Sequence, residues 1–130
     1  MRIFGIDYGD KKIGLAFGDS ETRVAVPLEA ILNSGDFTLR ALKERIKNEN
    51  IELVVIGVPL STGGHHGPEQ LEKTRNFIKD FQAVTGADVV EEDESYTTAE
   101  SIRLRCEEGA QANEDALAAM LILQSYFDKL

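Results

Sequence analysis

The feature that most constrains the fold is a predicted strand, turn and second strand at residues 2–19, RIFGIDYGDKKIGLAFGD. Ile3, Phe4 and Ile6 are apolar on both faces of the first strand, which is typical of a central strand covered on both sides. The return strand alternates bulky side chains with glycine and alanine, so one of its faces is bare. A bare face lets either a packed helix or a ligand approach the backbone closely.

Asp7 ends the first of these strands, at the rim of the predicted core. Burying a charge there is costly unless the charge is paired or binds a metal ion. Tyr8, Gly9 and Asp10 supply turn chemistry, and Gly9 can adopt a positive φ. Asp7 therefore has two interpretations: it caps the turn, or it belongs to a functional site that other carboxylates complete.

The length and composition of the chain indicate a globular protein. We expect one domain over residues 1–130, because 130 residues supply a single core and are too few for two. No apolar run is long enough to cross a bilayer, and there is no signal-peptide pattern. Cys106 is the single cysteine, which suits a reducing compartment. We therefore expect a cytoplasmic protein that does not associate with membranes.

The formal net charge of −9 restricts the partners of this protein. Nucleic-acid-binding proteins usually carry a basic surface, because neutralising phosphates supplies most of their non-specific affinity. A role on nucleic acid therefore requires a local basic patch, a divalent metal ion, or both.

The rest of the chain predicts one more strand of the hairpin series and then strands that alternate with helices. We expect strands at residues 22–31, 51–58 and 87–92, and helices at residues 36–48, 68–85, from 97 onward and from about 113 onward. Pro27 indicates that its strand lies at an edge or contains a bulge, and Asp36 is expected to cap its helix. The predicted fold class is α/β: a mixed five-stranded sheet, with three antiparallel strands followed by parallel ones, flanked by helices.

Three carboxylates from distant parts of the chain are predicted to converge. In a sheet of this order the first strand is usually central, and a parallel last strand would bring Glu94 to the same edge as Asp7. Asp115 lies in the first turn of the last helix, where Ala118 and Ala119 would let that helix approach the sheet. Hard oxygen ligands of this kind suit Mg²⁺ or Mn²⁺. Such ions can activate water for phosphodiester hydrolysis.

Each acid also has a simpler interpretation. Asp115 is favourable at a helix N-terminus through the macrodipole alone, and Glu94 follows a strand in an acidic stretch that water could solvate. Convergence of all three would favour a site, in which at least one carboxyl group should have a raised pKa while no metal is bound.

Four ordered motifs, spread over nearly the whole chain, resemble the YqgF family, which itself resembles Holliday-junction resolvases and ribonuclease H. They are IFGIDYGDKKIGLAFGD, VVIGVPLSTGG with the GP that follows, DESYTTAES and EDALAAMLILQSY. The resemblance implies a ribonuclease H-like fold and a metal-dependent nuclease with Asp7, Glu94 and Asp115 at its acidic positions. It also implies maturation of the 5′ end of pre-16S ribosomal RNA or, alternatively, resolution of branched DNA.

The expected substrate contacts lie around these acids. Lys11 and Lys12, in the turn beside Asp7, are best placed to meet a phosphate. The expected substrate-binding residues are Lys11, Lys12, Arg75, Thr97 and Thr98. Ser95 replaces an arginine that the family motif usually has, and serine cannot contact a phosphate bidentately.

Other functions remain open at this point. The acidic surface and Ser95 favour a nucleic-acid-binding or protein-binding module of the same fold with weak or no catalysis. The segment DYGDKKIG also resembles the phosphate loop of actin-like ATPases, but the chain has no residues left to build their second lobe. We expect a monomer or a homodimer, and a resolvase would need the dimer to present two sites to a two-fold junction.

Overall fold

The computed structural model describes residues 1–60, 68–94 and 114–130. Its elements are β1 (Arg2–Asp7), β2 (Lys12–Asp19), β3 (Val24–Leu32), α1 (Asp36–Asn48), β4 (Leu53–Val58), α2 (Pro68–Thr85), β5 (Val89–Asp93) and α4 (Glu114–Asp128). These elements confirm the predicted strands and helices to within a few residues. The helix predicted from residue 97 onward lies outside the described residues.

The strands form one five-stranded sheet in the order β3-β2-β1-β4-β5. The pairs β1–β2 and β2–β3 are antiparallel, whereas β1–β4 and β4–β5 are parallel. The central position of β1 and the parallel direction of β5 are therefore confirmed. This topology brings the carboxyl ends of β1 and β5 to the same edge of the sheet.

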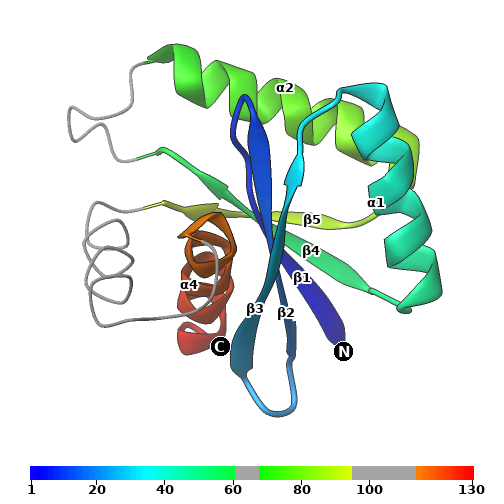
Figure 1. Ribbon diagram of the computed structural model, residues 1–130. Helices are drawn as coiled ribbons and strands as arrows, with labels where there is room; N and C mark the ends of the chain where they lie inside the picture. Colours follow the sequence, from blue (N-terminus) through cyan, green and yellow to red (C-terminus); the bar gives the residue numbers. More distant parts are fainter. Residues whose placement is uncertain (61–67, 95–113) are drawn as a thin grey trace.

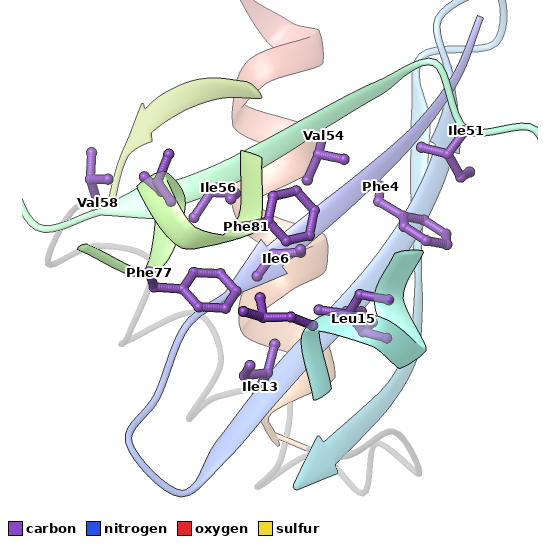
Figure 2. Close-up of a cluster of buried hydrophobic side chains, with 13 residues drawn as sticks. Phe4, Ile6, Ile13, Leu15, Ile51, Val54, Ile56, Val58, Phe77 and Phe81 are labelled. Carbon is purple, nitrogen blue, oxygen red and sulfur yellow. The ribbon is translucent and has the colours of Figure 1, made fainter. Parts of the chain in front are cut away.

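Helices α1 and α2 cover one face of the sheet, and α4 covers the other (Figure 1). On the first face, bulky side chains from the strands meet α2, as Figure 2 shows for Phe4, Ile6, Ile13, Phe77 and Phe81. All five side chains are almost completely buried. Because β-branched and aromatic residues line this face on neighbouring strands, their burial supplies much of the hydrophobic stabilisation of the fold.

The face beneath α4 is lined by glycine and alanine. A methyl group added at Gly5 would lie 2.8 Å from the carbonyl oxygen of Ala119, and one at Gly57 would lie 2.4 Å from Ile122 Cδ1. Glycine is therefore needed here for close approach of the helix to the strands. The bare face predicted from the sequence is occupied by a helix.

The outer strand β3 confirms the prediction from Pro27. The pairing between β2 and β3 steps from Glu29 to Pro27 without a partner for Leu28, which is a β-bulge. On the same strand, the side chain of Gln124 from α4 accepts a hydrogen bond from the Ala25 N–H at 3.0 Å. The bulge, the proline and this side chain reduce the capacity of β3 to pair with another strand.

The prediction that Asp36 caps α1 is wrong. The N-cap residue is Gly35, with φ 62°, and no side chain caps this end of the helix. Asp36 is the first helical residue, where its negative charge still interacts favourably with the helix dipole. The turn before the helix is fixed instead by the buried hydroxyl of Thr38, which donates to the Leu32 carbonyl at 2.8 Å and accepts from the Ser34 N–H at 2.7 Å. Among the described residues, none of the helices has the length and apolar character required to cross a membrane.

Candidate active site

Asp7 and Glu94 lie on the face of the sheet that α4 covers. Successive side chains of a strand point to opposite faces, so Asp7 shares the face of Gly5, where a side chain would collide with α4. Glu92 receives a hydrogen bond from Ser125 of α4, so Glu94, two residues further on, shares that face. The backbone N–H of Glu94 donates to the Val58 carbonyl at 2.8 Å, which holds the residue against the end of β4.

The third acid, Asp115, is brought to this place by the packing of α4. Gly14 of β2 is paired with Asp7 of β1. A methyl group at Gly14 would lie 1.9 Å from the backbone carbonyl oxygen of Asp115, so the first turn of α4 rests directly on this strand pair. The helix can adopt this position because Ala118 and Ala119, both buried, place little volume between it and the sheet.

The three acids interact electrostatically. The pKa of Asp7 is raised well above its ordinary value of 3.8, firstly by burial, then by the negative charge of Glu94 and a hydrogen bond with that carboxyl group, and finally by the charge of Asp115. A hydrogen bond between two carboxyl groups requires one of them to carry a proton. The site therefore favours a bound proton or another positive charge at Asp7.

The chemistry of these donors fits a hard divalent cation. Mg²⁺ is usually bound by one or two carboxylates, with water and substrate phosphate completing its octahedron. Within the ranges that the structure describes, no group of three or more His, Cys, Asp or Glu side chains is arranged to hold a metal ion. The adjacent carboxyl groups of Asp7 and Glu94 are a donor set of the size that Mg²⁺ requires, and Asp115 adds negative charge beside them.

The predicted substrate-binding residues differ in their placement. Lys11 and Lys12 are exposed, and Lys12 lies two residues before Gly14, which places it on the face of the acids. Arg75 lies on α2 and forms an ion pair with Glu91 at 3.4 Å, so it lies on the opposite face of the sheet. Thr97 and Thr98, like Ser95, lie outside the described residues.

Sequence reasoning missed a buried acid next to the site. Glu92 is only 4% exposed. Its carboxylate accepts a hydrogen bond from the Ser125 hydroxyl at 3.0 Å and forms an ion pair with Lys129. We call these three residues the Glu92 clamp, because they join β5, which leads into Glu94, to the helix that carries Asp115. The sequence signal for a buried acid was the acidic run at residues 91–94. Because successive side chains of a strand point to opposite faces of the sheet, part of this run must face a covering helix.

Comparison of the whole fold first defines the class of protein. The structure resembles T. thermophilus RuvC in complex with a Holliday junction substrate, with a TM-score of 0.65, 13% identity, and 99% of this chain and 95% of that chain covered. The fold is therefore the ribonuclease H-like fold of the resolvases.

Residues 1–129 match the family model described as "RuvX: Holliday junction resolvase", and the chain belongs to this family. Two curated relatives carry the name "Putative pre-16S rRNA nuclease". The one from Ruminiclostridium cellulolyticum is 35% identical, with 100% of this chain and 96% of the relative covered. The one from Bacillus subtilis is 36% identical, with 100% and 99% covered. The family resemblance predicted from the four sequence motifs is confirmed.

Proposed function

We propose that this protein is a Mg²⁺- or Mn²⁺-dependent nuclease whose catalytic residues are Asp7, Glu94 and Asp115, with Asp7 and Glu94 as the metal ligands. Its reaction is hydrolysis of phosphodiester bonds in the maturation of the 5′ end of pre-16S ribosomal RNA, in the cytoplasm. The observation that carries the catalytic part is the raised pKa of Asp7, caused by burial and by both other acids. The names of the full-length relatives support the choice of RNA substrate.

The residues of the site have two roles: the acids bind or attract the cation, and the lysines bind the substrate. Asp7 lies at the end of the central strand, which holds its backbone beside Glu94, so the two carboxylates repel each other when both are ionised. A bound divalent cation would supply a more acidic water molecule and stabilise the leaving oxygen. Asp115 adds negative charge from the α4 side, and Lys11 and Lys12 hold the substrate backbone at the turn that follows Asp7.

Cleavage of a labelled RNA that spans the 5′ end of 16S ribosomal RNA tests this proposal. We expect Asp7→Asn and Asp115→Asn each to lower the rate by at least about a hundredfold, because each removes charge that acts on the metal ion and the transition state. Glu114→Gln is the matched control: it also removes one negative charge in the first turn of α4, but at an exposed neighbouring position. A normal rate in Asp115→Asn would remove Asp115 from the mechanism.

Metal binding is tested separately by thermal unfolding. A ligand that binds only the folded state at a hundred times its Kd stabilises that state by about 2.7 kcal/mol. Mn²⁺ should therefore raise the Tm of the native protein and of Glu114→Gln, and should leave Asp7→Asn unchanged. Native protein that responds to Mn²⁺ but cleaves a four-way DNA junction and not the RNA would overturn the choice of substrate. Native protein that binds RNA and cleaves neither substrate would be a binding module.

A further inference from the structure

A cavity of about 250 Å³ lies on the face of the sheet opposite the three acids. It is formed where the turn after β1 meets the start of α1 and the middle of α2. Tyr8, which lines it, is the residue that directly follows Asp7. The cavity and the acids are therefore separated only by the end of the central strand.

One wall of this cavity is aromatic. The rings of Tyr8 and Phe77 are stacked, with their centroids 4.6 Å apart and an interplanar angle of 29°. Phe77 is held by the core around Phe81 and Ile13, as Figure 2 shows, and is 8% exposed. Tyr8 is only partly buried and lines the cavity, so part of this residue is accessible to an incoming group.

The rim of the cavity is polar, and its charge is mainly negative. Lys73 forms an ion pair with Asp10 at 3.3 Å, so its positive charge is partly neutralised. Asp36, Asn76 and Asp80 are exposed at the rim, and they present carboxylate oxygens and one amide. Carboxylates repel a phosphate, but they accept hydrogen bonds from amino groups, and an asparagine amide can pair with the edge of adenine.

The size of the cavity limits what can enter. Pockets for drug-sized ligands usually enclose about 300–1,000 Å³, so this cavity is smaller than such pockets. A single flat ring system fits these dimensions, and the stack of a base pair with its neighbours does not. Proteins that hold single strands use aromatic side chains as platforms for individual bases.

We propose that this cavity binds one unpaired nucleobase of the substrate strand, with the base against Tyr8 and its amino group at the Asp36, Asn76 and Asp80 rim. The proposal rests on the proposed nuclease function, because it places this base beside the phosphate that reaches Asp7. Adenine, cytosine and guanine carry an exocyclic amino group, whereas uracil and thymine do not. The site should therefore favour strands with an amino-bearing base at this position.

A single-stranded oligonucleotide with one 2-aminopurine among uracils tests the proposal, at low ionic strength and with a chelator so that no cleavage occurs. Stacking on Tyr8 should quench the fluorescence of the probe. Tyr8→Ala should abolish the quenching and weaken binding about tenfold, because a base–aromatic stack is worth about that factor. Tyr8→Phe should retain both, and Phe37→Ala is the matched control because Phe37 is an exposed aromatic residue outside the cavity.

Asn76→Ala tests the rim without disturbing the core, because Asn76 is exposed on α2. It should weaken binding of the probe several-fold, and competing strands with adenine or cytosine should displace the probe better than strands with uracil. Unchanged quenching in Tyr8→Ala overturns the proposal, as does a native protein that leaves the probe fluorescence unchanged. If Tyr8→Ala does not fold, unchanged binding of the probe by Asn76→Ala overturns it. The Asp7→Asn protein should quench the probe like the native protein. Quenching that depends on Tyr8 in a protein that cleaves nothing would retain the base site and reject the nuclease function.

Discussion

Asp7 is a carboxyl group that the fold holds in an unfavourable place for a negative charge. It ends a strand that is paired on both sides, and burial and its two acidic neighbours raise its pKa. Such groups are common at functional sites, where stability is lower than the fold could otherwise achieve. At the residue scale, the ionisation of Asp7 should therefore oppose folding while no cation is bound.

Replacement of Asp7 by asparagine should stabilise the metal-free protein at neutral pH. The folded-state pKa of Asp7 lies above its unfolded-state value, so the folded state binds the proton more tightly. The contribution of this group to stability is thus fully present below the unfolded-state value and is lost as the pH rises through the folded-state value. Urea unfolding with a chelator should show a higher free energy of unfolding for Asp7→Asn at neutral pH, and the difference should shrink as the pH falls. A less stable variant at neutral pH would contradict this view of Asp7.

At the scale of elements, the Glu92 clamp should couple β5 to α4. Lys129→Ala leaves the buried carboxylate of Glu92 with Ser125 as its remaining clamp partner. The loss of a partner by a buried polar group lowers the free energy of unfolding by about 1–3 kcal/mol. The same change in a Glu92→Gln protein should cost much less, because the charge is already absent. A double-mutant cycle in urea measures the difference. Equal costs in both backgrounds would show that the ion pair contributes nothing to stability.

The stability of the fold should depend to a similar extent on the contact between β2 and the start of α4. In Gly14→Ala the new methyl group overlaps the Asp115 carbonyl, so α4 must shift, at a cost of about 1–3 kcal/mol. The shift should also lower the cleavage rate and weaken the response to Mn²⁺. Gly35→Ala is the control: its methyl group meets nothing within 4 Å, and its cost comes from the positive φ alone. Gly14→Ala protein with normal activity per folded molecule would show that Asp115 does not depend on this contact.

The sequence allowed the elements and their order to be predicted, because each depends on local pattern. The alternation of glycine and bulky residues in β2 and the β-branched run of β4 each indicated a strand, and Pro27 indicated an edge or a bulge in β3. The cap of α1 was predicted wrongly because Asp36 and the Gly35 before it both suit the start of a helix, and the positive φ of Gly35 is set by the turn. The partners of Glu92 could not be predicted, because they come from α4 and the residue that directly follows it, more than 30 positions away.

At the scale of the whole molecule, the acidic surface conflicts with a polyanionic substrate. A net charge of −9 disfavours any approach of RNA, so binding requires local cations, a divalent metal ion, or both. Each phosphate that a lysine neutralises contributes about 0.7 to the slope of log affinity against log salt for a single strand. The number of lysines that contact the substrate is therefore measurable without a structure of the complex.

A comparison of two double variants separates the effect of local contacts on RNA binding from the effect of total charge. Lys11→Ala/Lys12→Ala and Lys43→Ala/Lys47→Ala each remove two exposed positive charges, so their net charges are equal. The first pair lies at the turn beside Asp7, and the second lies on α1, which covers the other face of the sheet. Only the first should weaken RNA binding by roughly tenfold or more and lower the salt slope by about 1.4, measured by fluorescence anisotropy over a range of salt concentrations. Equal losses in both variants would mean that the protein attracts its substrate through total charge alone, and that the turn beside Asp7 does not guide the strand to the acids.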